Sequence, residues 1–416
     1  MRYAERLHWK HGLDPNHTMN NFHTHLCLVS AQATPNLLPL LDEAWRPKKV
    51  VLACSAQMKH AAQALRAVIQ SKAAGMVVET LDLPNAYDYS ALSDTFLNYL
   101  AEHEDEHIAL NVTGGTKLMA VAAQEAFRSA EKSVFYVNVE SDQVLVIGEK
   151  TMGQPVPPLR TKLKVHEILR AHGYTVTTQE RPQITRELRD LTARLVDRVS
   201  SAGRALGALN ALARAARDNN LRVDLNRDQS SLALGDLVAL FADAGLLRQQ
   251  GDVLTFKDEE SRFFANGGWL EAHVFEALQS LRAQHDGLTD VAMGVRVGFG
   301  GNDPRARGKD KNEIDVAFLY RNTLHLIECK TANLAQGGKG DDTKATEALY
   351  KMESLLKLGG LRTRGMVVDY RGQLANSDAD RQRAKESHIE IVAGAQLKDL
   401  KGTISRLWLS QPKNGI

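Results

Sequence analysis

The sequence contains few cysteines and no long apolar run. Its three cysteines, Cys27, Cys54 and Cys329, are far apart and each lies in an apolar stretch, so neither a disulfide framework nor a zinc site is expected. No apolar run approaches the roughly 18 residues of a membrane span, and the polar, histidine-bearing start is unlike a signal peptide. We therefore expect a cytoplasmic protein with no membrane partner.

The composition is that of a protein with several domains. Hydrophobic residues make up 43% of the 416 residues and charged residues 25%, which is enough for two or three cores of ordinary size. The net charge is only +2, but residues 160–222 contain 13 Lys and Arg against six Asp and Glu. This excess could contact a polyanion, or it could form the solvated face of basic helices.

The first 150 residues alternate between strands and helices at the spacing of βαβ units. The predicted strands are 25–30, 49–55, 76–83, 107–112, 133–139 and 143–147. The predicted helices are 35–43, 57–72, 90–103 and 117–130. This alternation predicts a parallel, doubly wound sheet, which binds its ligands beyond the carboxyl ends of the strands.

Two of these strand ends are small and polar. One is Ser30-Ala31-Gln32 and the other is Thr113-Gly114-Gly115-Thr116-Lys117, which runs from a strand directly into a helix. The glycines would let backbone N–H groups approach a phosphate or ribose, and the threonines and Lys117 would add donors. The spacing is not that of a Walker A loop. A glycine turn that only caps a helix is the alternative.

Residues 111–117, NVTGGTK, resemble the ligand loop of CARF domains, the Rossmann-like sensors of type III CRISPR systems. The resemblance implies a homodimer whose two loops bind one cyclic oligoadenylate, most often cyclic tetra-adenylate, across the two-fold axis. It assigns the segment from Thr113 to Lys117 to the ligand loop. Ser30, Gln32 and Ser55 are assigned only because they lie at neighbouring strand ends.

The middle of the chain is predicted to be a linker followed by a helical connector. Residues 154–159 contain three prolines, which favours a linker. Residues 163–172 and 184–219 have helical periodicity, and a predicted helix at 232–246 precedes a hairpin at 247–256. A helix followed by a hairpin is typical of a winged helix, which could bind DNA. We favour a structural connector between two functional domains.

Residues 312–331, NEIDVAFLYRNTLHLIECKT, predict a β-hairpin with Arg321 and Asn322 in a tight turn. Counting outward from this turn places Asp315 opposite Glu328 and Glu313 opposite Lys330, on one face of the hairpin. Like charges directly opposite each other destabilise a strand pair, and a divalent cation with oxygen ligands would compensate them. Lys330 could then orient water or stabilise charge on a phosphate. A surface hairpin with alternating charges is the alternative.

Asp315 and the triplet Glu328-Cys329-Lys330 resemble the active site of the PD-(D/E)xK nuclease superfamily. That superfamily takes a further acid from a preceding helix, and Glu271 supplies it at the start of the predicted helix 269–281. Ile314 stands where the motif has proline. The predicted order of helix, strand 291–299, hairpin, helix 343–358 and strands 365–368 and 388–392 is the αβββαβ core of the superfamily.

These features predict an α/β protein of three parts. Residues 1–150 form a Rossmann-like CARF domain, residues 151–262 a linker and a helical, winged-helix-like connector, and residues 263–416 a PD-(D/E)xK restriction-endonuclease-like domain. Basic loops at 298–311 and 334–342 flank the predicted nuclease site and could follow a phosphodiester backbone.

In this order the two resemblances imply the Card/Can family of cyclic-oligoadenylate-activated nucleases. The expected activity is cleavage of single-stranded DNA, nicking of supercoiled DNA, or cleavage of RNA, or more than one of these. It would serve type III CRISPR antiviral defence. Asp315, Glu328 and Glu271 would hold Mn2+ or Mg2+, and Lys330 would act on the attacking water. A DNA-binding transcription regulator under CARF control, or a nuclease outside CRISPR, are the alternatives.

Overall fold

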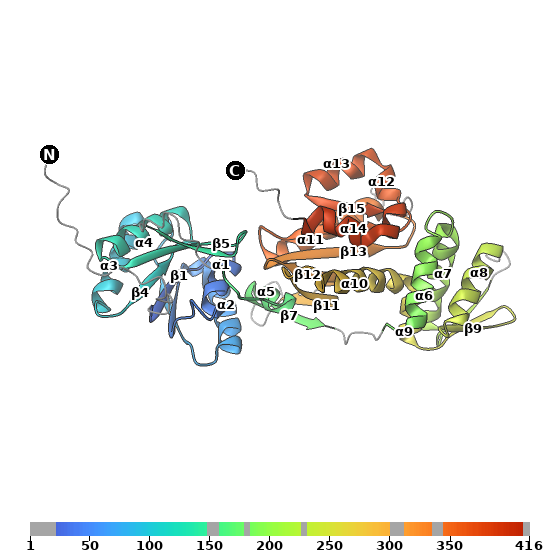
Figure 1. Cartoon of the computed structure of the whole chain (residues 1–416), viewed down its shortest axis with the longest axis horizontal. Helices are drawn as coiled ribbons and strands as arrows, with labels where there is room; N and C mark the ends of the chain where they lie inside the picture. The colour runs from blue at the N-terminus through green and yellow to red at the C-terminus, as the bar shows by residue number, and fades with distance from the viewer. Residues whose placement is uncertain are drawn as a thin grey trace. The chain divides into compact units, whose positions relative to one another are not determined.

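The computed structural model describes residues 22–147, 158–178, 184–225, 231–299, 312–334 and 344–410. The chain forms two compact units, coloured by residue number in Figure 1. The first unit comprises Met1–Lys162 and Ala171–Gly173, and the second comprises Leu163–Arg170 and Tyr174–Ile416. No helix in the described ranges is long and apolar enough to cross a membrane.

The first unit contains a six-stranded sheet in the order β3-β2-β1-β4-β5-β6. Its strands are β1 Thr24–Leu28, β2 Lys49–Cys54, β3 Val77–Asp82, β4 Ile108–Asn111, β5 Ser133–Asn138 and β6 Gln143–Ile147. Its main helices are α1 Thr34–Leu41, α2 Lys59–Lys72, α3 Tyr89–Glu102 and α4 Lys117–Ser129. The first five strands are parallel and β6 is antiparallel to β5. The predicted doubly wound sheet is therefore confirmed, and its order reverses between β1 and β4.

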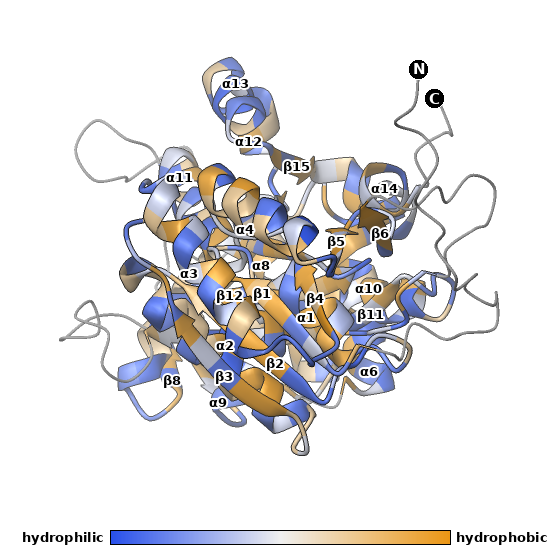
Figure 2. Ribbon diagram, turned by 90° about the vertical axis from the view of Figure 1, so that its left-hand side faces the viewer, coloured by the Kyte–Doolittle hydropathy of each residue, from blue (hydrophilic) through white to orange (hydrophobic). Residues whose placement is uncertain are grey.

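The central strands of this sheet are buried on both faces. Every residue of β1 and β4 is buried, and so is most of β2, as expected for parallel strands between two helical layers. Figure 2 shows these strands in the orange of apolar residues. On one face Phe96 of α3 and Phe127 of α4 are completely buried against Leu26 and Leu110. This packing fixes the carboxyl edge of the sheet, where the predicted ligand loop lies.

The second unit contains another six-stranded sheet, in the order β15-β14-β13-β12-β11-β7. Its strands are β7 Tyr174–Thr178, β11 Leu288–Phe299, β12 Asn312–Tyr320, β13 Thr323–Lys330, β14 Arg364–Asp369 and β15 Ile389–Ala393. The pairs β13-β14 and β14-β15 are parallel and the others antiparallel. With helices α10 Trp269–Arg282 and α11 Lys344–Leu356, the predicted αβββαβ order is observed. The sequence pattern did not predict β7 at the edge, nor α12 Gln373–Asn376, α13 Asp378–Glu386 and α14 Leu400–Ile404.

The helical middle segment packs into the same core as this second sheet. It contains α5 Val165–Ala171, α6 Arg186–Asp197, α7 Gly203–Ala215, α8 Leu232–Asp243 and a small sheet of β8 Arg222–Asp224, β9 Leu247–Gln250 and β10 Val253–Phe256. The helix and hairpin at its end match the prediction, whereas the run 184–219 is divided between α6 and α7. Leu206 and Phe241 share one apolar cluster with Trp269 and Phe318.

His25 is an ionisable residue in the interior of the first unit. Its side chain is fully buried in β1, and neither ring nitrogen has a hydrogen-bond partner among the described residues. The ring packs against Phe135 with a centroid distance of 5.1 Å. Burial lowers the pKa of His25 to about 3, because a charged imidazolium would lose its hydration there.

We predict that His25 makes the protein sensitive to mild acid. Below pH 6.5 the unfolded chain binds a proton at this histidine and the folded chain does not, so stability falls as the pH decreases towards 3. The loss is about 1.4 kcal/mol per pH unit. Urea unfolding between pH 7 and pH 5 should show a smaller loss for His25→Leu than for the wild type. His107→Gln, a change at an exposed histidine, should behave as the wild type; equal pH dependence in all three proteins would contradict the prediction.

Candidate active site and nucleotide-binding loop

The hairpin β12-β13 has the predicted turn and register. Arg321 and Asn322 have φ values of 49° and 54°, the left-handed conformation of a two-residue type I′ turn. The paired residues run from Tyr320 with Thr323 to Val316 with Ile327. Beyond this pair the Asp315 carboxylate crosses to the partner strand, where its Oδ2 accepts the N–H of Cys329 at 2.7 Å. Asp315 is therefore beside the ends of Glu328 and Lys330, as counting from the turn predicts.

Glu313, predicted to lie opposite Lys330, is beyond the paired part of the hairpin, which ends at Val316 and Ile327. It is in register with Arg296 of β11, and its Oε2 is 3.7 Å from the Arg296 Nε. The neighbouring antiparallel strand, which the count along the hairpin left out, supplies this opposite charge.

Glu328 is the most buried charged group of the site. Its side chain is 1% exposed, and its Oε1 accepts hydrogen bonds from the Nζ of Lys330 and, at 2.6 Å, from the Nζ of Lys351 on α11. Its Oε2 is also buried and has no hydrogen-bond partner in the described ranges. A buried carboxylate oxygen without a partner is destabilising, so this oxygen is available for a ligand.

Glu271 reaches the site through an unusual helix start. A π-helical turn, Phe264–Gly268, leads directly into α10, and Gly267 in it has a φ of 117°. A Cβ on Gly267 would lie 2.6 Å from the Thr331 Oγ1, so only glycine fits against the end of β13. The buried Trp269 ring meets Tyr370 edge-on at 5.2 Å. This arrangement places Glu271 in the first turn of α10, near the other acids.

The three acids affect one another through charge. Burial, and then the charge of Glu328, raises the pKa of Asp315 to about 7. Burial, followed by Asp315, Glu313 and Glu328, raises the pKa of Glu271 well above its usual value. Burial alone would lower the pKa of Lys330, but Glu328 and Asp315 together raise it. The site thus concentrates negative charge in a poorly hydrated region.

The donor chemistry of this region fits a divalent cation. Carboxylate oxygens are the ligands that Mg2+ and Mn2+ prefer, and a bound cation would use the Glu328 Oε2 and relieve the raised pKa values. Among the residues that the structure describes, no group of three His, Cys, Asp or Glu is arranged to hold a metal. The acids are therefore close enough to interact electrostatically, but they do not form a complete set of metal ligands.

Sequence reasoning missed Lys351. It lies on α11 beside the apolar face formed by Ala348, Leu349, Met352 and Leu355. A lysine at the border of an amphipathic helix is common on protein surfaces, so only the structure reveals its contact with Glu328. The predicted basic loops 298–311 and 334–342 lie, apart from their ends, outside the described residues.

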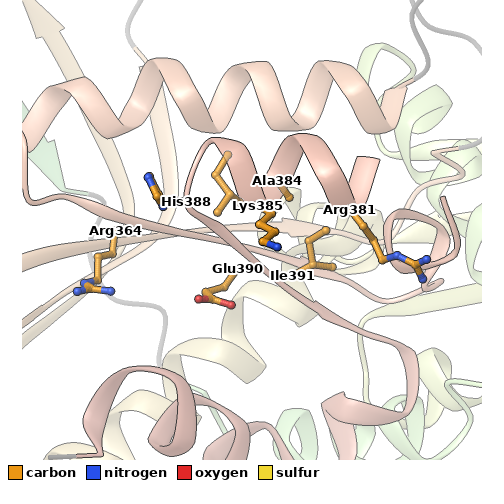
Figure 3. A pocket seen from close by; sticks show the side chains of 8 residues that line it. Arg364, Arg381, Ala384, Lys385, His388, Glu390 and Ile391 are labelled. Carbon is orange, nitrogen blue, oxygen red and sulfur yellow. The ribbon is translucent and has the colours of Figure 1, made fainter. Parts of the chain in front are cut away.

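A pocket elsewhere in the second unit does not contain this site. It has a volume of about 420 Å³ and lies between α13 and the strands β14 and β15. Figure 3 shows Arg364 and Arg381 at its opposite ends, with Glu390 between them. Arg364 is in register with His325 at the start of β14, whereas Asp369 at the end of β14 is in register with Lys330. The pocket and the acidic site are therefore at opposite ends of the strand.

The loop between β4 and α4 in the first unit has a backbone that requires glycine. A Cβ on Gly114 would lie 2.1 Å from the Leu28 carbonyl oxygen, and Gly115 has a φ of 76°. Thr116 caps α4, since its Oγ1 accepts the N–H of Met119 at 3.2 Å. Lys117, the first residue of this 13-residue helix, is exposed. The loop thus presents a helix N-terminus and a lysine, which favours an anionic ligand.

The other predicted binding residues lie at the same edge of the sheet. The Ser30 Oγ accepts the N–H of Gln32 at 3.2 Å, and a Cβ on Gly114 would lie 3.5 Å from this oxygen. The Gln32 Nε2 is buried without a hydrogen-bond partner among the described residues. Ser55 is buried directly after β2, which is next to β1. The structure therefore brings Ser30 and Gln32 to the glycine loop, with Ser55 one strand further away.

Two asparagines connect these loops: Asn111, the first residue of the NVTGGTK motif, and Asn36, which sequence reasoning missed. The Asn111 Nδ2 donates to the Asn36 Oδ1 at 3.1 Å, and the Asn36 Nδ2 donates to the Leu28 carbonyl at 3.0 Å. The Asn111 Oδ1 accepts the Thr113 hydroxyl at 2.7 Å. Asn111 is fully buried at the end of an apolar strand. A polar residue at the end of such a strand is the feature of the sequence that could have identified its role.

Comparison with known proteins supports both halves of this description. Residues 24–168 match the family model of the Card1 CARF domain, and residues 258–410 match that of the Card1-like endonuclease domain. The predicted α/β architecture, with an N-terminal CARF domain and a C-terminal endonuclease domain, is thereby confirmed. No curated protein matches the sequence.

Two solved structures share the fold over nearly the whole chain. Protein VC1899 from Vibrio cholerae is 25% identical, with a TM-score of 0.81 over 93% of this chain and 98% of that one. Can2 from Sulfobacillus thermosulfidooxidans, in complex with cyclic tetra-adenylate, is 24% identical, with a TM-score of 0.71 over 93% of this chain and 97% of that one.

We predict that Gly114→Ala destabilises the first unit and distorts the loop. The added methyl group would collide with the backbone at Leu28, and such overpacking typically costs about 1–3 kcal/mol. Gly75→Ala is the matched control, because its Cβ would have no neighbour within 4 Å. Thermal unfolding should show a lower Tm for Gly114→Ala alone, and an unchanged Tm would contradict the geometry of the loop.

We also predict that Asp315→Asn stabilises the metal-free protein. The amide oxygen can still accept the Cys329 N–H, but the negative charge beside Glu328 is removed. In the presence of a chelator at pH 8 we expect a gain of about 1–3 kcal/mol. Asp286→Asn, at an exposed position, should have no effect. A lower stability of Asp315→Asn in urea unfolding would show that the acids do not repel one another.

Proposed function

The chain belongs to the Card1-like family, a CARF domain joined to an endonuclease domain, and we propose that it is a metal-dependent nuclease activated by cyclic tetra-adenylate. In this proposal it is an effector of type III CRISPR antiviral defence and acts as a homodimer. The observation that carries the nuclease assignment is the buried Glu328, whose Oε2 has no partner in the described part of the chain, beside Lys330 and Asp315.

The residues of the site have different roles in phosphodiester hydrolysis. Asp315 and Glu328, with Glu271, would hold Mn2+ or Mg2+, which when bound neutralises charge on the phosphate and acidifies water. Lys330 remains protonated beside Glu328 and Asp315, so its ammonium orients the water or stabilises the charge that develops on the phosphate. The Cys329 N–H holds Asp315 in place at 2.7 Å.

The CARF loop is the proposed site of the activator. The segment from Thr113 to Lys117 would receive phosphate or ribose groups at the start of α4, with Ser30, Gln32 and Ser55 around it. The partnerless Gln32 Nε2 supports a polar ligand at this edge. The Can2 structure, which holds cyclic tetra-adenylate, supports the choice of that ring. Two such loops, one from each protomer, would bind one molecule.

The substrate is DNA or RNA. Attack by an activated water needs no 2′-hydroxyl, so the chemistry of the site is compatible with both. A transcription regulator that does not cut would gain nothing from a buried carboxylate with a free oxygen, and this favours the nuclease.

A cleavage assay tests the proposal. We expect the wild type to cut single-stranded DNA, supercoiled plasmid or RNA only when both Mn2+ and cyclic tetra-adenylate are present. Glu328→Gln should lose at least about 100-fold in rate, because it removes a charged ligand, and should still bind cyclic tetra-adenylate in calorimetry.

The exposed Glu386 provides the matched control, and Glu386→Gln should cut as the wild type does. Cutting by the wild type in the presence of a chelator, or full activity of Glu328→Gln, would refute the assignment. Tight activator binding with no cutting of any substrate would favour the regulator.

A further inference from the structure

Lys351 brings a second ammonium group to the nuclease site from a different element. It lies on α11, which packs its apolar face on the sheet. Its Nζ is 2.6 Å from the Glu328 Oε1, and it is also close enough to Asp315 for its charge to act on that carboxyl. The active-site motif of the hairpin contains only Lys330, so no role is assigned to Lys351.

The two lysines bind only one of the two carboxylate oxygens of Glu328. Both ammonium groups donate to Oε1, while the buried Oε2 has no donor among the described residues. One ammonium would neutralise one carboxylate, and two like charges on a single oxygen repel each other. A cation on Glu328 would increase this repulsion, so we expect the less firmly held ammonium to leave.

Lys351 is the lysine that is free to move. Its side chain is 39% exposed, against 26% for Lys330. Lys330 is the last residue of β13 and is in register with Asp369 of β14, and its carbonyl accepts the N–H of Tyr370 at 2.9 Å, which restrains its backbone. Lys351 extends to Glu328 from a helix, along a flexible stem of four methylene groups, so it can release Glu328 without any change in the sheet.

We propose that Lys351 is a substrate-binding residue of the nuclease site, which pairs with Glu328 in the metal-free protein and turns to the phosphodiester when a cation binds Glu328. A phosphate oxygen offers the ammonium a charge-assisted hydrogen bond in place of the one it loses. This inference rests on the proposed nuclease function. The rival explanation is that Lys351 only neutralises Glu328 and has no contact with substrate.

The two explanations differ once the site is saturated with metal. We would compare Lys351→Met and Lys351→Arg with the wild type, and use Lys357→Met as the control, because Lys357 is an exposed lysine just beyond the same helix. Mn2+ affinity is measured by calorimetry without substrate. Cleavage of a labelled oligonucleotide, taken from the preferred substrate class, is measured at saturating Mn2+ and cyclic tetra-adenylate.

If Lys351 binds substrate, Lys351→Met should bind Mn2+ as tightly as the wild type or more tightly, since a competing positive charge is gone. Its kcat/KM at saturating Mn2+ should fall at least tenfold, and Lys351→Arg should recover most of this loss. Lys357→Met should match the wild type in both measurements. Should Lys351→Met fail to fold, Lys351→Gln serves as the neutral variant.

Two results would overturn the inference. Cleavage by Lys351→Met at the wild-type rate would show that Lys351 only neutralises Glu328 and does not bind substrate. A tenfold loss of Mn2+ affinity would show instead that it shapes Glu328 as a metal ligand. If the wild type neither binds Mn2+ nor cuts any substrate, the proposed function itself is refuted. If the wild type does both and only the expectations for Lys351→Met fail, this inference alone is refuted.

Discussion

The second unit depends on how a completely buried carboxylate is held. Glu328 lies in a central strand of the sheet, where the loss of hydration makes an ionised group costly unless it is paired. Two ammonium groups offset that cost at Oε1, and nothing described offsets it at Oε2. A protein selected only for stability would place an apolar residue here. The arrangement is therefore best understood as a site that is completed by a ligand.

The surrounding structure holds the partners of Glu328 in fixed places. The left-handed turn at Arg321 and Asn322 sets the register of the hairpin, and a slip of one residue would move Asp315 to the apolar face. The kinked start of α10 requires glycine at Gly267 because Thr331 occupies the space of a side chain. Two separate local conformations thus converge on one small group of acids.

Patterns with a short range in the sequence predicted much of this arrangement. Strict alternation and a two-residue turn gave the hairpin, and a glycine pair after an apolar strand gave the loop from Thr113 to Lys117. Contacts that join distant segments were not predictable in this way. Lys351 is 23 residues from Glu328, Asn36 is 75 residues from Asn111, and β7 pairs with β11 across more than a hundred residues. Each depends on packing, which a single sequence does not display.

The contacts of the helical middle segment explain why it belongs with the nuclease sheet. The Tyr370 hydroxyl donates to the Leu195 carbonyl of α6 at 2.7 Å, and Asn210 of α7 shares a hydrogen bond of 2.9 Å with the Thr331 hydroxyl. Thr331 directly follows Lys330, and Tyr370 directly follows Asp369, which is in register with Lys330. Both anchors are buried, so these helices cannot shift without moving the ends of β13 and β14. The position of Lys330 therefore depends on these helices as well as on the hairpin that carries it.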